Sequence, residues 1–220
     1  MSFLNDSSTS ETNTRDRILS AAVKVFSNKG YHDTRVDEIV EESDTSKGAV
    51  YFHFPSKQRI FLAIVEEFTV LLEKKLLQAI EREPDGVRRV NAALQIGLET
   101  FGKYRSIAKI FLVQAIGLGQ AFEEKRLEIL ARFAAVIKSY LDQAVSEGDI
   151  PPLDTEVAAY AWIGAINEVV IRWVHTGQPE PERVLPTLRT ILLRSIGVSE
   201  SHIHELEQEA VREAARESNQ

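Results

Sequence analysis

The stretch TRVDEIVEESDTSKGAVYFHFPSK, residues 34–57, decides the fold of this chain. Its apolar residues recur at helical spacing on both sides of a polar turn at Ser43-Asp44. The pattern predicts two short helices, the second over about residues 46–52, which opens with small, polar and basic residues and closes with aromatic ones. In a helix-turn-helix, such a second helix enters the DNA major groove while the first crosses the backbone. The stretch is therefore typical of a DNA-binding motif.

Helices are also expected on either side of this motif. One covers about residues 15–29 and ends at Gly30, because glycine readily terminates a helix. A long one runs from about residue 57 to residue 82. Thr34 is expected to cap the second helix of the head, with Asp37 three residues later, much as in a capping box. These segments predict a three-helix head joined to a long fourth helix.

Beyond a break at residues 84–86, helical spacing continues and no stretch alternates in the manner of a strand. We therefore expect an all-α protein with a helix-turn-helix head, a larger helical body and about nine or ten helices. The body helices are expected at residues 87–103, 106–116, 120–146, 154–176 and 182–196, followed by a thinner apolar stripe over 200–217 that forms either a short docked helix or a tail.

The composition is typical of a soluble globular protein, with 44% hydrophobic and 27% charged residues among 220. The absence of cysteine excludes disulfides, thiolate metal sites and a cysteine nucleophile. Residues 1–13 are rich in Ser, Thr and Asn and lack the apolar core of a signal peptide. No run approaches the ~18 apolar residues of a membrane-spanning helix. We therefore expect a cytoplasmic protein that does not enter a membrane.

The net charge of −7 is unevenly distributed along the chain. Residues 15–59 hold eight basic and seven acidic side chains, a net +1, whereas residues 60–220 carry −6. Attraction to DNA depends on the charge within about a Debye length, ~8–10 Å, rather than on the total. The near-neutral head is therefore compatible with DNA binding even though the whole chain is acidic.

Several residues of the motif have the chemistry of groove and phosphate contacts. The first turn of the third helix presents free backbone N–H groups, and Gly48 there allows close approach to the groove wall. Tyr51, His53 and Lys57 carry hydrogen-bonding groups suited to phosphates. The alternative is that these are the ordinary caps, turn residues and core of any three-helix unit.

Residues 15–61 also contain a series of short motifs in a fixed order. The series comprises Ile18-Leu19-x-Ala21-Ala22 with Phe26, Gly30-Tyr31, Thr34 with Val36, Ile39, and Ser46-Lys47-Gly48-Ala49-Val50-Tyr51-Phe52-His53-Phe54-x-Ser56-Lys57. It resembles the N-terminal domain of the TetR/AcrR family of bacterial transcriptional regulators. One departure is Ser43-Asp44, where the family usually has Ala-Gly. Because Asp tolerates the left-handed conformation better than most residues, the turn is expected to be intact.

The resemblance implies a homodimer whose heads enter successive major grooves of a near-palindromic operator, about 34–36 Å apart. It also implies repression that is relieved by a small hydrophobic effector, with activation as the alternative. The expected parts are a disordered arm at 1–13, the DNA-binding domain at 14–60, a ligand-binding and dimerisation domain at 61–198, and a C-terminal helix or tail at 199–220. The implied DNA contacts are Thr34, Thr45, Ser46, Lys47, Gly48, Tyr51, His53 and Lys57.

Residues 160–175 form a mostly apolar helix whose small residues permit close approach of another helix. Together with the following helix, it is expected to build a four-helix interface across a two-fold axis. The alternative is a helix buried in the core of one subunit. The expected interface residues are Ala161, Trp162, Ala165, Val169, Trp173, Leu188, Ile191, Leu192 and Ser195.

Asn167, Glu168 and Arg172 interrupt this apolar helix, and polar groups in such a place need partners. Either they satisfy one another or a dimer mate, or they face a ligand. The motifs of the body, among them residues 122–126, 148–150 and 164–173, are similar to the fatty-acid-degradation regulator (FadR-like) branch of the family, whose members respond to long-chain acyl-CoA.

This similarity implies an acyl chain among aromatic side chains and CoA phosphates near Arg105 or Lys109. If Arg105→Ala and Lys109→Ala leave acyl-CoA affinity unchanged, that placement is wrong. A planar hydrophobic drug, as for a regulator of an efflux system, is the competing effector. The expected ligand-binding residues are Phe68, Leu72, Phe101, Tyr104, Arg105, Lys109, Phe111, Gln114, Phe133, Ile137, Asn167 and Arg172.

An enzyme that metabolises a small molecule and a DNA-free interaction module are the rival classes. The sequence has no glycine-rich phosphate loop and no nucleophile elbow, and His202 and His204 are a poor metal pair because they point to different sides of a helix. We expect no catalysis, cofactor or metal. Of these classes, only a DNA-binding protein is expected to lose affinity for DNA steeply as the salt concentration rises. Lys57→Ala is expected to reduce the slope of this dependence by about one. Effector and DNA binding are expected to be coupled through the helix at 57–82.

Overall fold

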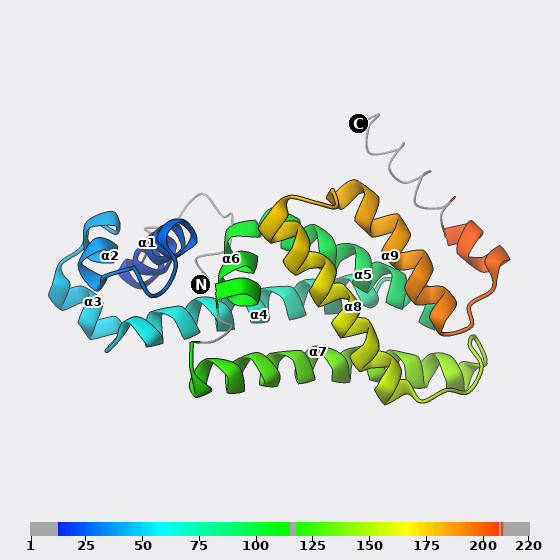
Figure 1. The fold of residues 1–220 in the computed structure, drawn as a ribbon. Coiled ribbons are helices and arrows are strands. Elements are labelled where there is room, and N and C mark those ends of the chain that lie inside the picture. Colours follow the sequence, from blue (N-terminus) through cyan, green and yellow to red (C-terminus); the bar gives the residue numbers. More distant parts are fainter. Residues whose placement is uncertain (1–12, 115–117, 207, 209–220) are drawn as a thin grey trace. The chain divides into compact units, whose positions relative to one another are not determined.

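The structure, a computed structural model, describes residues 13–114, 118–206 and 208, without the side chains of residues 113, 114, 181 and 182. It confirms the all-α fold: this part of the chain forms ten helices and no strand. Residues 200–206 are helical as well. The ten helices are α1 (Thr14–Lys29), α2 (Val36–Glu42), α3 (Lys47–His53), α4 (Lys57–Ile80), α5 (Gly86–Lys103), α6 (Arg105–Lys109), the π-helix η1 (Ile110–Gln114), α7 (Gln120–Glu147), α8 (Thr155–Thr176) and α9 (Pro181–Ser195) (Figure 1).

Helix ends in the head follow the cap residues of the sequence. Helix α1 ends at Gly30, which has φ +86° and donates its N–H to the carbonyl of Phe26 at 2.8 Å. Ser46 caps α3, because its Oγ accepts the N–H of Ala49 at 3.1 Å. Free N–H groups at a helix start need such acceptors. These two expected boundaries are confirmed.

The expected start of α2 was wrong by one residue. Arg35, not Thr34, precedes the helix, and its N–H donates to Oε2 of Glu38 at 2.9 Å, so Glu38 takes the place expected for Asp37. The Thr34 side chain is buried and its hydroxyl donates to the carbonyl of Gly30 at 2.7 Å. This local hydrogen bond, to a residue four positions earlier, uses the hydroxyl that was expected to cap the helix.

The single helix expected at residues 106–116 is instead α6 followed by the wider η1. Residues 115–117 lie outside the described part, as do residues 1–12 of the expected arm and residues 207 and 209–220 of the expected tail. Over so short a segment, the spacing of apolar residues does not distinguish a π-helix from an α-helix.

The chain divides into two compact units. The first comprises residues 1–74 and 103–129, and the second comprises residues 75–102 and 130–220. In the first unit, α1 packs against α2, α3 and α6 (Figure 1), and the unit also contains the beginning of α4. The three helices of the head are therefore part of a larger packed body rather than an isolated domain.

Aromatic rings form the centre of the first unit. Phe61 of α4 lies edge-on to Phe26, Tyr31 and Phe122, with ring centroids 5.7, 5.2 and 5.1 Å away. Phe26 and Phe61 are fully buried. Edge-on aromatic pairs add to the stability that comes from burying apolar area. This cluster fixes α1 and the loop after it against α4 and the start of α7.

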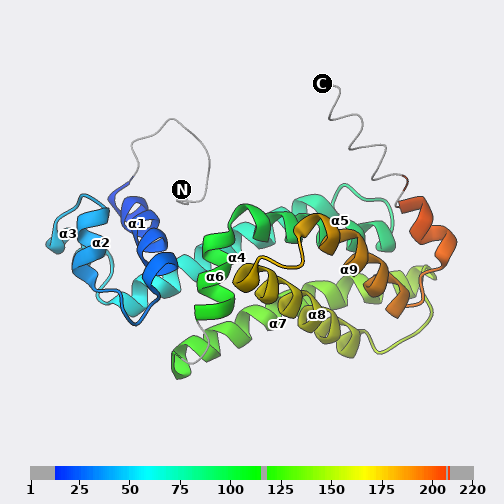
Figure 2. The same cartoon turned by 45° about the horizontal axis from the view of Figure 1, so that its top comes forward.

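The second unit has its own core between α5, α7, α8 and α9 (Figure 2). Gly86 opens α5 close to α7, where an added Cβ would lie 2.7 Å from the Cβ of Ala144, so the approach requires glycine. The Gly86 N–H donates to Oδ2 of Asp149 at 3.3 Å. The largest buried members of this core include Val87, Leu94, Leu141, Ile150, Trp162, Leu188, Leu192, Leu193 and Ile196.

Candidate DNA-binding surface and effector site

The turn between α2 and α3 has the geometry that the sequence predicts. Asp44 adopts φ +48°, the left-handed region in which glycine and Asp are least strained. Ser43 Oγ lies 2.8 Å from Thr45 Oγ1, and the Arg17 guanidinium donates to the carbonyls of Ser43 and Asp44 at 2.8 and 2.6 Å. The expectation that this turn tolerates Asp in place of glycine is therefore confirmed.

Helix α3 is anchored on one side and open on the other. Val50 is fully buried and Phe54, just beyond the helix, is 5% exposed. Because residues four apart share a face of a helix, Lys47 lies beside Tyr51 on the open side. Of the expected DNA contacts in this region, Ser46, Lys47, Gly48 and Tyr51 are exposed, and Thr45 and His53 are half-buried.

Thr34 and Lys57 meet at the loop between α1 and α2. The Lys57 ammonium donates to the carbonyls of Tyr31, His32 and Thr34 at 2.7, 3.2 and 2.7 Å, and it lies 4.5 Å from the Tyr31 ring centroid. Burial lowers the pKa of Lys57. A lysine ammonium has three N–H donors, and these carbonyls occupy all of them. A phosphate contact by Lys57 stays a prediction that requires release of a carbonyl.

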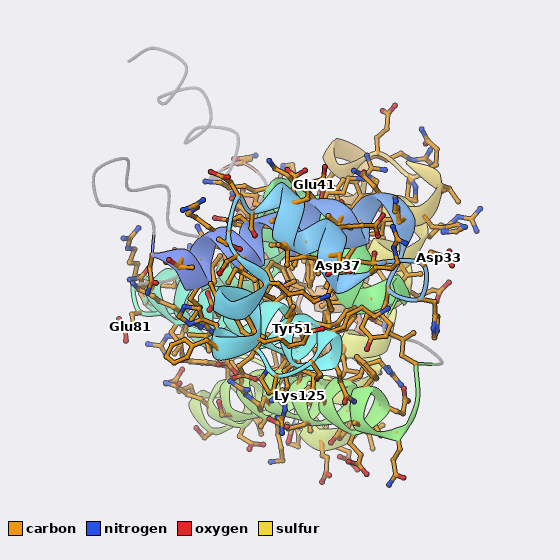
Figure 3. All side chains as sticks on the ribbon, turned by 90° about the vertical axis from the view of Figure 1, so that its left-hand side faces the viewer. Asp33, Asp37, Glu41, Tyr51, Glu81 and Lys125 are labelled. Atoms are coloured by element: carbon orange, nitrogen blue, oxygen red, sulfur yellow. The ribbon has the colours of Figure 1, made fainter. Side chains whose placement is uncertain are left out.

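Acidic side chains lie beside the open face of α3. The Lys47 ammonium pairs with Oδ1 of Asp37 at 2.7 Å, and both side chains are largely exposed. This hydrogen bond raises the pKa of Lys47. Figure 3 shows Asp33, Asp37 and Glu41 near the face that carries Tyr51. A carboxylate therefore lies beside Lys47, one of the residues expected to bind DNA.

Phe52 is the residue of α3 that the sequence reasoning missed. Its side chain is 84% exposed, the most exposed large hydrophobic side chain in the described residues. A signal was present in the sequence: Tyr51-Phe52-His53-Phe54 places four aromatic rings in a row, and one face of a short helix cannot bury all of them.

The expected ligand-binding residues divide between the two units. In the first unit Phe68, Leu72 and Phe111 are buried, and Phe68 stacks edge-on with Tyr104 at 6.1 Å between centroids. The Lys109 ammonium donates to the carbonyl of Ser27 in α1 at 3.0 Å. Arg105 is exposed, and the Gln114 side chain lies outside the described residues.

In the second unit an apolar cavity of about 240 Å³ opens between α5, α8 and α9. Phe101 is the expected ligand-binding residue that lines it; Phe133 and Ile137 are half-buried elsewhere in the unit, as is Asn167, and Arg172 is exposed. No hydrogen bond among the described side chains joins Asn167, Glu168 and Arg172 to one another. The lining residues are Leu98, Glu99, Phe101, Gly102, Val169, Val170, Trp173, Val184 and Leu185.

Comparison with known proteins identifies the head. The sequence model for "Bacterial regulatory proteins, tetR family" matches residues 18–64, which run from α1 into α4. The head of the chain is a TetR-family DNA-binding domain. Members of this family are transcriptional regulators, and the matched segment contains the helix-turn-helix of α2 and α3 described above.

The similarity to known proteins extends over both units. The fatty acid metabolism regulator protein of Bacillus subtilis is 26% identical over 170 residues, which cover 74% of this chain and 84% of the relative. The fatty acid degradation regulator FadR from Bacillus halodurans superposes with a TM-score of 0.79 at 19% identity, covering 87% of this chain and all of that one. FadR from Bacillus subtilis in complex with stearoyl-CoA superposes with a TM-score of 0.74 at 19% identity, covering 84% of this chain and 98% of that one. The solved structures establish a shared fold.

The expected interface residues fall into two groups. Trp162, Leu188 and Leu192 are buried in the core of the second unit, and the Trp162 indole N–H donates to Oγ of Ser195 at 3.0 Å. Ala161, Ile191 and Ser195 are exposed, and Ala165, Val169 and Trp173 are half-buried.

Helix α8 carries more apolar surface than one chain covers. By length and composition alone this helix is apolar enough to cross a membrane, although no membrane-spanning helix was expected from the sequence. A single helix of this kind is weak evidence for a membrane, since core helices of soluble proteins have the same properties. Here 22% of its most apolar stretch is buried within the chain, and Val157 and Tyr160 are 63% and 52% exposed. This uncovered surface requires an explanation.

Proposed function

We propose that this chain is a ligand-responsive repressor that binds a near-palindromic operator as a homodimer. The observation that carries the DNA-binding part is the TetR-family match over residues 18–64 together with the open face of α3. Val50 and Phe54 fix that helix to the core, so Lys47 and Tyr51 project from a rigid support. Contacts to phosphates position such a helix, and contacts to base edges give it sequence specificity.

The homodimer in this proposal covers the apolar surface of α8 and α9. Val157, Tyr160 and Ile191 are large apolar side chains that are more than half exposed on these two helices. Obligate dimer interfaces are apolar and resemble a domain core divided in two. A second copy that packs α8 and α9 against the same helices of the first removes this surface from water. A cytoplasmic location agrees with this role.

The effector in this proposal is a long-chain acyl-CoA. Support comes from the fatty acid metabolism regulator of Bacillus subtilis among the relatives and from the FadR of that organism, which was solved in complex with stearoyl-CoA. In this chain the 240 Å³ cavity of the second unit is apolar, as an acyl chain requires. It is smaller than the ~300–1,000 Å³ of typical small-molecule pockets, so side chains must move when the effector binds.

Coupling between effector and operator is expected to use α4, which belongs to the first unit up to Lys74 and to the second from Lys75. An allosteric coupling of ~1–3 kcal/mol changes operator affinity by about 5–150-fold. Crystals of free, effector-bound and DNA-bound dimers with identical head separation would exclude this coupling.

The direct test is fluorescence anisotropy with the full chain and labelled DNA from immediately upstream of its own gene. We expect tight binding that a long-chain acyl-CoA reverses and that the free fatty acid does not. Tight binding that acyl-CoA does not reverse would support the DNA-binding regulator and exclude acyl-CoA as its effector. A chain that binds this DNA no better than random DNA of equal length contradicts the proposal for this operator.

A further inference from the structure

We propose that Phe52 reads a thymine methyl group in the operator and so sets part of the sequence specificity of the regulator. This inference rests on the proposed DNA-binding function and adds a residue that the family motif does not assign. It begins from an unfavourable feature of the free protein, because a phenylalanine ring that is 84% exposed contributes no core packing. The ring is therefore available to contact a binding partner.

The position of Phe52 on α3 directs its ring to the open face of that helix. Phe52 lies four residues after Gly48, so the two share a face, and side chains of a helix lean toward its N-terminus. An added Cβ on Gly48 would meet only Oγ of Ser46, at 3.9 Å. No other part of the described chain covers the helix surface between Gly48 and Phe52. The ring lies edge-on to its neighbour His53, with centroids 5.2 Å apart.

Two stripes of different chemistry thus run along the exposed side of α3. Lys47 and Tyr51 form a polar stripe, and Gly48 and Phe52 form an adjacent stripe without any hydrogen-bonding side chain. A protein partner is a poor match for this arrangement, because interfaces are contiguous apolar patches and Phe52 is flanked by polar and charged groups. DNA is a good match, since the neighbouring polar stripe supplies contacts for phosphates.

In the DNA major groove, the apolar group displayed by the base pairs is the C5 methyl of thymine, and phenylalanine is among the side chains that contact it. An aromatic ring on the groove-facing side of α3 therefore favours a thymine over a cytosine at one position of each half-site. The bare Gly48 leaves room on the same face for the base pair to approach.

The test removes the methyl group from the DNA and the ring from the protein, separately and together. An operator is first selected from random duplexes with the full-length wild-type chain, and each thymine of both half-sites is then replaced by deoxyuridine, which lacks only the C5 methyl. For wild type, we expect one thymine position in each half-site at which loss of the methyl group weakens operator binding by about fourfold. This factor corresponds to ~0.8 kcal/mol for one methyl-sized group. Phe52→Ala, which removes the ring from both heads of the dimer, is expected to bind the unmodified operator at least about 16-fold more weakly, the product of two fourfold losses, and deoxyuridine at that position has no further effect on its affinity.

Three controls separate this contact from other causes. Leu127→Ala on α7 removes another exposed apolar side chain of the same unit and is expected to leave operator affinity unchanged. Phe52→Leu keeps an apolar contact and is expected to retain part of the deoxyuridine effect. The salt slope of Phe52→Ala stays that of wild type, because no ionic contact is lost, and equal thermal midpoints show that the variant is folded.

The proposal is overturned if every deoxyuridine replacement has the same effect on wild type and on Phe52→Ala. If the selection has nevertheless enriched an operator that the chain binds with steep salt dependence, the proposed DNA-binding function is retained and only the role of Phe52 is rejected. Selection that enriches no sequence overturns both the proposed function and this inference.

Discussion

The ammonium of Lys47 lies 2.7 Å from a carboxylate oxygen of Asp37, so the cation expected to meet DNA is paired within the protein. Both side chains are more than half exposed, at 60% and 65%. Exposed ion pairs of this kind are weak and screened by salt. DNA therefore has to displace Asp37 from Lys47 or tolerate a carboxylate beside its phosphates.

Replacing Asp37 by Asn is predicted to tighten operator binding. The change releases Lys47 and removes one negative charge near the phosphates. At low salt we expect an increase in affinity of about fivefold, the effect of one unit charge ~4 Å from another in water, and a smaller increase at high salt. Anisotropy titrations at two salt concentrations measure it. Glu156→Gln, which removes an exposed charge on α8, is the charge-matched control; an equal gain in that variant would mean that net charge rather than the Lys47 pair is responsible.

The sequence predicted some local features of the head and not others. Gly30 as the end of α1 and the left-handed Asp44 depend on residues close in the chain, and both are confirmed. Thr34 was misassigned because its hydroxyl donates to the carbonyl of Gly30, four residues earlier, instead of capping α2, and the residue type alone does not distinguish these two local hydrogen bonds.

In the body, the sequence predicted the positions of the helices but not the partners of their side chains. Apolar spacing predicted the helices, yet it does not distinguish a side chain that packs inside one chain from one that faces a second copy. Trp162 and Ile191 were placed together in one interface, whereas the structure buries Trp162 and leaves Ile191 56% exposed. The cavity likewise depends on where α5, α8 and α9 meet, and of its lining only Phe101 was expected as a ligand contact.

Lys57→Met is predicted to destabilise the first unit. The Lys57 ammonium satisfies three carbonyls of the loop between α1 and α2, and its loss leaves polar groups without a partner at a cost of about 1–3 kcal/mol. Chemical denaturation measures the free energy of unfolding. Lys24→Met, which removes an exposed lysine paired with Glu42, is expected to change it by no more than about 0.5 kcal/mol. Equal effects of the two substitutions would show that the carbonyl contacts do not stabilise the loop.

The same Lys57 variant also separates two roles in DNA binding. If the ammonium reaches a phosphate in the complex, the log–log salt slope falls by about one for each head, or about two for the dimer. A slope equal to that of wild type, with weaker binding, would assign Lys57 to the support of the loop alone.

The stability contributed by Glu38 is predicted to disappear in acid. The Arg35 N–H and then the Lys29 ammonium donate to this carboxylate, which lowers its pKa below the ordinary value of 4.5. A lowered carboxylate pKa gives stability that is complete above the unfolded value and is lost as the pH falls through the folded value. The thermal midpoint of Glu38→Gln is therefore expected below that of wild type at pH 7, with a difference that shrinks below pH 4.5. A constant difference from pH 7 to pH 3 would refute this, and Glu41→Gln on the same helix is the control.

Gly102→Leu is predicted to weaken acyl-CoA binding by filling the cavity of the second unit. Gly102 lines the cavity and has no atom within 4 Å of an added Cβ, so the larger side chain can extend into the space without a clash. We expect at least a tenfold loss of affinity, because a leucine takes up volume that the acyl chain needs, about 1.4 kcal/mol or more. Gly102→Ala, which adds one methyl group, is expected to have a smaller effect. Undiminished acyl-CoA binding by Gly102→Leu would place the effector elsewhere, and operator affinity without effector checks that both variants remain functional.

Hydroxyl-radical footprinting of the full-length chain on the DNA upstream of its own gene tests the central claim most directly. Two heads of a homodimer predict two protected segments of related, inverted sequence whose centres are about 10–10.5 base pairs apart, or a multiple of that spacing. Protection that is absent at concentrations where the chain is fully bound to DNA, or that is spread evenly without a repeated segment, would contradict the account of this chain as an operator-specific dimeric regulator.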